Sequence, residues 1–112
     1  MYIVRCEDGS LYTGITTDPR RRMQEHVKRL PACAKYTRSH QVCALCALWS
    51  ARTKGAALRL EARIKKLTPA KKRALIAAPA SFAPIFEDTL DEADYHPEPL
   101  FPLAPLLAEK AQ

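Results

Sequence analysis

Prolines divide this chain into two unequal parts. Six of the nine prolines lie between Pro79 and Gln112, and a proline inside a helix removes a hydrogen bond and clashes with the preceding turn. A long helix is therefore excluded from this tail, and the core must come mainly from residues 1–78. We expect one small domain there, because domains of about 100 to 150 residues are the commonest. The tail also carries Phe and Leu side chains, so we expect residues 79–112 to be partly docked or disordered.

The charges follow the same division. Residues 1–78 contain seventeen Lys and Arg against five Asp and Glu, whereas residues 79–112 contain one Lys against seven acids. A basic body favours a polyanionic partner, although charge alone also fits a plain basic surface. No apolar run approaches the roughly 18 to 20 residues of a membrane span, and no signal peptide opens the chain. We therefore expect a cytoplasmic protein with no membrane partner.

The four cysteines are too few for the disulfide framework of a small secreted domain, so we expect reduced thiols. Cys43 and Cys46 have the spacing of a zinc site, but they lie in an apolar run that indicates a strand. Residues three apart on a strand point to opposite faces. We expect these cysteines to pack in the core, with a zinc-stabilised interaction domain as the weaker alternative.

Two short strand-like segments, Tyr2–Cys6 and Leu11–Thr16, flank a turn and predict a β-hairpin. A three-residue loop, residues 8–10, places Tyr2 and Tyr12 on the same face of the sheet. A four-residue loop places them on opposite faces. The sequence leaves this register open.

Further elements follow the hairpin. Asp18 and then Pro19 predict the start of a helix that runs to about residue 30, because Asp caps free N–H groups and proline suits the first turn. Residues 31–40 are predicted as a loop, and the apolar run over residues 42–49 as a buried central strand. Residues 54–67 and 69–77 are predicted as two more helices, the second of them capped by Thr68.

Polar residues lie beside the apolar stripes of two predicted helices. In the first helix, Arg22, His26 and Arg29 line up about a quarter turn from the buried stripe, where they border the core and still meet solvent. In the second, Glu61 lies on the flank of the stripe. It either serves a site there or simply pairs with Lys65 one turn later.

The order and spacing of these residues form a known pattern. After Tyr2 come nine residues, then Tyr12-Thr13-Gly14, then an arginine eight positions after the glycine and a histidine four further on. With the segments 34–38 and 57–61, this pattern resembles the GIY-YIG nuclease domain, in its small stand-alone bacterial branch, over about residues 2–76. The resemblance implies an α+β fold in residues 1–78, with a small three-stranded, mainly antiparallel sheet flanked by about three helices.

The resemblance also implies a metal-dependent endonuclease that hydrolyses DNA with one Mg²⁺ or Mn²⁺ ion. By position, Tyr2 and Tyr12 correspond to the tyrosines of the two motifs, Arg22 to the catalytic arginine, His26 to the catalytic histidine or tyrosine, and Glu61 to the metal-binding glutamate. These residue types suit the chemistry of phosphodiester hydrolysis, since a guanidinium can hold two phosphate oxygens and a carboxylate provides the hard oxygen ligands that Mg²⁺ and Mn²⁺ prefer. Whether Tyr2 or Tyr12 receives the proton of the attacking water stays open.

Six further side chains are predicted to contact nucleic acid: Arg20, Arg21, Arg29, Lys35, Tyr36 and Arg38. Tyr36 lies between the basic residues Lys35 and Arg38 in the sequence and could stack on a nucleobase. Other GIY-YIG enzymes use a separate domain to select their DNA target. For this protein we expect DNA to be selected by its structure rather than by its sequence. Single-stranded, branched or damaged DNA, as in DNA repair, is the expected partner, and no protein partner is evident. The alternative is a non-catalytic nucleic-acid-binding module that retains the nuclease fold.

Overall fold

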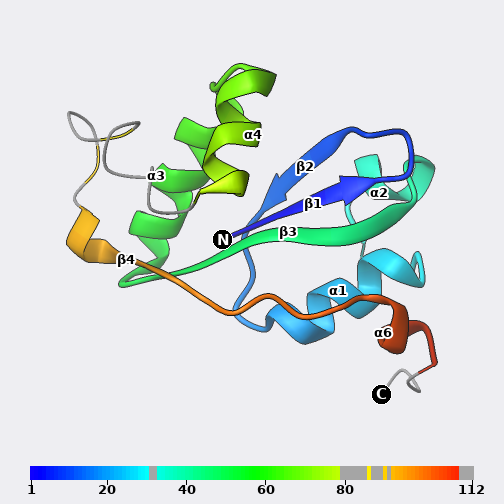
Figure 1. Cartoon of the computed structure of the whole chain (residues 1–112). Coiled ribbons are helices and arrows are strands. Elements are labelled where there is room, and N and C mark those ends of the chain that lie inside the picture. The colour runs from blue at the N-terminus through cyan, green and yellow to red at the C-terminus, as the bar shows by residue number, and fades with distance from the viewer. Residues whose placement is uncertain (31–32, 79–85, 87–89, 91, 109–112) are drawn as a thin grey trace.

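A four-stranded antiparallel sheet forms the centre of the molecule (Figure 1). The computed structural model describes residues 1–30, 33–78, 86, 90 and 92–108. The strand order is β2-β1-β3-β4, with β1 (Tyr2–Cys6), β2 (Leu11–Gly14), β3 (Val42–Ala51) and β4 (Tyr95–Pro97). The predicted α+β class with an antiparallel sheet is confirmed. The fourth strand, which the sequence did not indicate, comes from the tail.

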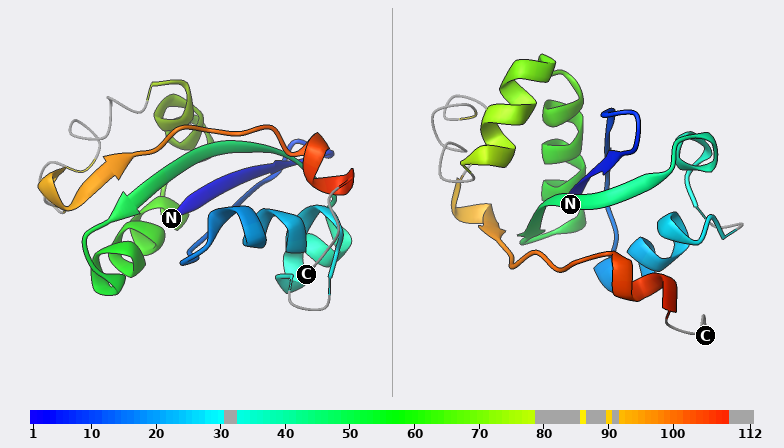
Figure 2. Two further views of the ribbon diagram at one scale, coloured as in Figure 1. Left: turned by 90° about the horizontal axis from the view of Figure 1, so that it is seen from below. Right: turned by 45° about the vertical axis from the view of Figure 1, so that its right-hand side comes forward.

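Helices cover both faces of this sheet (Figure 2). Helix α1 (Pro19–Val27) packs on one face, and α3 (Lys54–Lys65) and α4 (Pro69–Ala77) pack on the other. Three short elements complete the described chain: α2 (Lys35–Ser39), the 3₁₀ turn η2 (Glu92–Asp94) and α6 (Ala104–Ala108). Helix α2 lies where the sequence indicated a loop.

The register of the hairpin places the two tyrosines of the pattern together. Tyr2 lies opposite Gly14, and Tyr12 lies opposite Val4, so both tyrosines share one face of the sheet. The Cys6 amide donates to the Ser10 carbonyl at 2.8 Å, which leaves a three-residue turn over residues 7–9. Its last residue is a glycine with a φ of 85°, a conformation that other residues rarely adopt. The shared face is the one expected from a three-residue loop, although the turn lies one residue earlier.

Strand β3 is irregular where it pairs with β1. The pairing skips one residue at Cys43 and another at Cys46, which are two β-bulges. The prediction that both cysteines pack in the core is wrong, because Cys43 is exposed and Cys46 is only half-buried. A hydrogen bond that the Arg5 guanidinium donates to the Cys43 sulfur, together with the electrostatic influence of Cys43 and Cys46, raises the pKa of Arg5. Both thiols therefore lie near one guanidinium, and simple strand alternation fails at these two positions.

The helix starts follow their predicted caps more closely than the helix ends do. The Asp18 carboxylate accepts from the Arg21 amide at 3.1 Å, and the Thr68 hydroxyl accepts from the Lys71 amide at 3.2 Å. Helix α1 ends at Val27, three residues earlier than expected, and Arg29 beyond it has a φ of 51°. Arg29 is therefore exposed outside the helix and does not extend the row of Arg22 and His26.

Two apolar clusters hold the layers together. The cluster between the sheet and α3 and α4 contains Met1, Ile3, Trp49, Leu60, Ile64 and Leu75. The cluster between the sheet and α1 contains Tyr2, Val4, Met23, Val27, Leu103 and Leu106. Complete burial of a side chain of this size stabilises the fold by about 1.5 to 3 kcal/mol. The sheet is consequently fixed from both sides near the start of β1.

The described part of the tail packs along the body of the protein. Strand β4 pairs with the end of β3, and the Tyr95 hydroxyl donates to the Ala56 carbonyl at 2.8 Å. The chain then crosses to the other face, where α6 lies against α1 and buries Leu103 and Leu106 (Figure 1, orange to red). In the residues that the structure describes, no helix is long and apolar enough to cross a membrane.

Candidate active site

The start of β1 and the end of β2 form the floor of the candidate site. Tyr2 is fully buried, and its ring lies directly over Gly14. A Cβ at position 14 would lie 2.6 Å from Cζ of Tyr2, closer than real side chains pack. The glycine of the second motif is thus required because it makes room for the tyrosine of the first motif.

A chain of hydrogen bonds passes through the Tyr2 hydroxyl. This hydroxyl accepts from Nε of Arg22 at 3.3 Å and lies 2.7 Å from Nε2 of His26. On the other side of the imidazole, Nδ1 of His26 lies 2.9 Å from the Thr37 hydroxyl, which donates to the Ala34 carbonyl at 3.0 Å. The structure therefore brings Tyr2, Arg22 and His26 together, as the pattern predicted.

The direction of these bonds follows from the Thr37 hydroxyl. Thr37 has a single hydroxyl proton and gives it to a carbonyl, so its oxygen can only accept from the imidazole. Nδ1 of neutral His26 then carries the proton, and Nε2 is left as the acceptor for the Tyr2 hydroxyl. Thr37 is fully buried and was not among the predicted site residues, because the sequence indicated only a loop around it.

Burial controls the ionisation of this pair. The expectation that His26 meets solvent is wrong, since the histidine is fully buried under the Tyr2 and Tyr12 rings at 5.5 and 5.7 Å. Burial, with the neighbouring Arg22 charge, lowers the pKa of His26 to about 4. Burial raises the pKa of Tyr2 to about 12, even though Arg22 opposes the shift. Both side chains are therefore uncharged at neutral pH.

The lowered pKa of His26 is expected to make the protein less stable in acid. Between about pH 4 and 6.5 the unfolded chain binds a proton at this histidine that the folded protein does not. The free energy of unfolding should therefore fall as the pH falls, by about 3 kcal/mol from this residue between neutral pH and about pH 4. Urea unfolding at a series of pH values between about 4 and 7 measures this change in the free energy of unfolding. A His26→Gln variant with the same acid dependence as the wild type would contradict the assignment.

A stack of aromatic rings continues the site away from Tyr2. The Tyr12 and Tyr36 rings lie 5.9 Å apart at 18°, and the Tyr36 and His40 rings lie 3.9 Å apart at 2°. The sequence did not single out His40, which also lies 3.8 Å from the Asp8 carboxylate. His40 covers one face of the Tyr36 ring, so a nucleobase could stack on that face only by displacing His40.

Arg22 connects the buried hydroxyl to the surface. Its Nη1 pairs with Glu25 at 3.0 Å, and about one fifth of each of these side chains is exposed. Burial alone would lower the pKa of Arg22, but the hydrogen bonds to Tyr2 and Glu25 outweigh it and raise that pKa. The guanidinium is therefore fixed in orientation and charged at any working pH.

Glu61 approaches from helix α3, on the face of the sheet opposite α1. Its side chain is 20% exposed, and its carboxylate lies 3.7 Å from the Lys65 ammonium. Its negative charge adds to the effect of burial in raising the pKa of Tyr2, and it opposes the lowering of the Met1 ammonium pKa by burial. Glu61 thus faces the start of β1, and its link to Tyr2 is one of charge.

Glu61 is a suitable ligand for a hard divalent ion. Within the described residues, no three His, Cys, Asp or Glu side chains gather around a common point. Mg²⁺ commonly uses only one or two protein carboxylates and takes its remaining oxygens from water and substrate phosphate. A partly buried carboxylate with a face in solvent fits this requirement.

The other side chains predicted to contact nucleic acid lie outside the hydrogen-bond chain of Arg22, Tyr2 and His26. Arg20, Arg21, Arg29, Lys35 and Arg38 are all exposed. The Arg20 guanidinium lies 5.8 Å from the centre of the Phe101 ring, so it contacts the tail. These cations come from α1, α2 and the segment after α1.

Comparison with known proteins agrees with this geometry. Residues 1–74 match the family model of the GIY-YIG catalytic domain. A UPF0213 protein of Fusobacterium nucleatum is 40% identical over 82 residues, which cover 73% of this chain and 80% of that protein. The UPF0213 protein YhbQ of Escherichia coli is 41% identical over 83 residues, covering 74% and 81%. No solved structure gives a significant match. The chain therefore belongs to the GIY-YIG nuclease family.

Proposed function

We propose that this protein is a metal-dependent endonuclease that hydrolyses DNA phosphodiester bonds. The observation that carries the proposal is the directed hydrogen-bond chain from Arg22 through Tyr2 to His26. A hydroxyl that accepts from a fixed cation and donates to a neutral imidazole is placed to pass on a proton. This chain begins beside the surface, where a phosphate can reach the guanidinium.

The two pKa values favour a relay over a free phenolate. With a pKa of about 12, Tyr2 is a phenol at neutral pH, so its oxygen can take a proton from water only as it releases its own. Nε2 of His26 is the acceptor for that second proton, and neutral His26 is available because its pKa is about 4. We therefore assign the proton-receiving oxygen to Tyr2, while Tyr12 packs against the imidazole through its ring.

Substrate binding strengthens this relay. Protonated His26 is unfavourable beside the Arg22 charge, which helps to lower its pKa. A phosphate bound to Arg22 offsets that charge and so raises the pKa of His26. The base therefore becomes stronger when DNA is present. Water loses its proton as its oxygen bonds to phosphorus, while the bond from phosphorus to the leaving oxygen breaks and its electron pair stays on that oxygen.

Arg22 also stabilises the charge that develops on the phosphate. Attack on a phosphodiester adds negative charge to its non-bridging oxygens, and a planar guanidinium can hold two of them. A preorganised donor of this kind contributes about 3 to 4 kcal/mol to the transition state. Glu25 and Tyr2 fix the guanidinium before the substrate arrives, so little reorganisation is needed.

Glu61 would hold one Mg²⁺ or Mn²⁺ ion in this account. When bound, such an ion stabilises negative charge on the leaving oxygen. Replacing Glu61 with glutamine keeps the shape of the side chain and removes its charge. We expect Mn²⁺-dependent cleavage of labelled forked DNA to fall on the order of 100-fold or more.

The matched control is Glu7→Gln, because Glu7 is an exposed carboxylate in the hairpin turn. This variant should cleave at close to the wild-type rate, and both variants should bind DNA normally in EDTA. A Glu61→Gln enzyme with full activity would show that the metal, if required, is held elsewhere.

The proposed substrate is single-stranded, branched or damaged DNA, as DNA repair would supply, and selection follows shape rather than sequence. The exposed cations of α1, α2 and the segment after α1 suit contacts to the sugar-phosphate backbone, which carry no sequence information. Binding should weaken steeply with salt for the same reason. Rates on single-stranded, forked and fully paired DNA of the same sequence test this directly, and a preference for one duplex sequence would contradict it. Binding without cleavage of any substrate would favour a non-catalytic module.

A further inference from the structure

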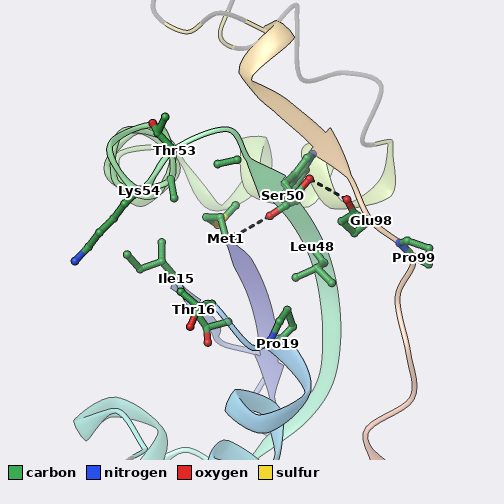
Figure 3. Close-up of a pocket in the computed structure, with 14 residues that line it drawn as sticks. Met1, Ile15, Thr16, Pro19, Leu48, Ser50, Thr53, Lys54, Glu98 and Pro99 are labelled. Carbon is green, nitrogen blue, oxygen red and sulfur yellow. Dashed lines mark hydrogen bonds between the residues drawn. The ribbon is translucent and has the colours of Figure 1, made fainter.

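A cavity of about 790 Å³ lies beside the candidate active site. Figure 3 shows it between the connection from β2 to α1, the start of α3, and the tail segment at Glu98 and Pro99. Its volume lies within the roughly 300 to 1,000 Å³ of sites that bind small molecules. Tyr2, Arg22 and His26, which form the proposed proton relay, do not line this cavity.

The strands connect this cavity directly to the site. Met1 lines the cavity and is the residue before Tyr2. Ile15 lines it from another side and is the residue after Gly14. Paired backbone hydrogen bonds of 2.9 Å between Met1 and Trp49 hold the first of these walls in place. The cavity and the Tyr2 hydroxyl therefore share the same ends of β1 and β2.

The helices make the same connection. Pro19 lines the cavity and lies three residues before Arg22 on α1. Ala57 lines it and lies four residues before Glu61 on α3. Side chains three or four residues apart lie on the same side of a helix, one turn from each other. Arg22 and Glu61, the proposed phosphate contact and metal ligand, therefore each lie one helix turn from a wall of this cavity.

The chemistry of the walls suits a flat ring with a polar edge. Ile15 is half-buried and provides apolar surface, and Leu48 and Trp49, which are 9% and 2% exposed, form the buried base of the cavity. At one side, the Ser50 hydroxyl donates to the Glu98 carboxylate at 2.8 Å, which orients that carboxylate in the wall. A carboxylate accepts hydrogen bonds from the exocyclic amino groups of nucleobases. Lys54, exposed at the rim, adds a positive charge for the phosphate backbone outside the cavity.

We propose that this cavity binds one unpaired nucleobase of the DNA strand next to the scissile phosphate, with preference for a base that carries an exocyclic amino group. This inference rests on the proposed function and deepens it, because only a base outside a duplex can enter. Glu98 and Pro99 also lie beyond residues 1–74, which match the family model. The tail therefore supplies the wall that selects the base.

Trp49 allows a direct test, because it lines the cavity and is the only tryptophan in the chain. Its fluorescence is followed in EDTA during titration with short single-stranded oligonucleotides that present cytosine, thymine or an abasic site at one position. We expect a saturable change with cytosine, binding about 10-fold weaker with thymine, and no change with the abasic strand.

Three variants sharpen the measurement. Ala57→Phe fills the cavity and should weaken cytosine-dependent binding about 10-fold or more. Ala62→Phe places the same ring at an exposed position of the same helix, outside the cavity, and should bind as the wild type does. Glu98→Gln should keep binding but lose the difference between cytosine and thymine, since an amide both donates and accepts.

The outcomes separate this inference from the proposed function. An abasic strand that changes Trp49 fluorescence as cytosine does would overturn the nucleobase site even in an active nuclease. Unchanged discrimination in Glu98→Gln would do the same for the assigned contact. Base-dependent binding without cleavage in Mn²⁺ would leave the cavity as a nucleobase site and reject the hydrolase.

Discussion

Replacing Arg22 with alanine is expected to lower the single-turnover rate of DNA cleavage by about 100- to 1,000-fold, the usual effect of removing one preorganised donor. The variant loses the cation that holds the phosphate and the Nε donor to the Tyr2 hydroxyl. It also loses the charge whose neutralisation raises the pKa of His26 on substrate binding. Cleavage should therefore fall far more than DNA affinity does.

Arg21→Ala provides the control for this variant. Arg21 is the preceding residue on α1 and is exposed, so its loss should weaken backbone binding slightly at low salt and change the bound-state rate little. Thermal unfolding of both variants excludes a loss of folding as the cause. Equal rates for Arg22→Ala and Arg21→Ala at saturating DNA would contradict the role of Arg22.

Replacing Tyr2 with phenylalanine should lower the rate by about 100- to 10,000-fold, the range for loss of a positioned proton-transfer group. The change keeps the ring that lies over Gly14 and removes only the oxygen between Arg22 and His26. The proton of the attacking water then has no route to Nε2 of His26. Cleavage is measured with enzyme in excess over labelled DNA.

Tyr12→Phe is the informative partner of that variant. Tyr12 contacts His26 and Tyr36 through its ring, which phenylalanine preserves. Its rate should fall much less than the rate of Tyr2→Phe. A larger loss in Tyr12→Phe would move the proton-receiving role to Tyr12, which is the choice that the sequence left open.

Local signals explain the parts of the fold that the sequence predicted well. Asp18 and Thr68 cap the backbone within three residues, so the starts of α1 and α4 depend only on nearby chemistry. The hairpin turn likewise uses Gly9 with its positive φ, although the turn lies one residue earlier than the loop that the sequence suggested. These features are encoded in a few adjacent residues, and a single sequence is enough to find them.

Long-range packing explains what the sequence did not predict. The bulges at Cys43 and Cys46 arise from pairing with a strand more than thirty-five residues away. Strand β4 pairs with the end of β3, and its Tyr95 hydroxyl donates to a carbonyl on α3. No short segment contains the information for such contacts. The alternation of apolar residues therefore placed Cys43 and Cys46 in the core wrongly, and the composition of the tail did not indicate β4.

The candidate site shows the same division. The spacing of Tyr2, Arg22 and His26 predicted that they meet, and the structure joins them by hydrogen bonds. The burial of His26 and the role of Thr37 depend on α2 folding over the imidazole, which the sequence indicated only as a loop. The tautomer of His26, and with it the direction of the proton path, could be derived only from the three-dimensional contacts.

Cleavage and binding by the wild-type protein, measured on the same labelled forked and single-stranded DNA with Mn²⁺ or with EDTA, test the central claim most directly. The proposed relay and metal ligand predict that DNA is bound in both conditions and nicked only with Mn²⁺. DNA that is bound in Mn²⁺ yet stays intact at enzyme excess would contradict the claim that this site hydrolyses phosphodiesters.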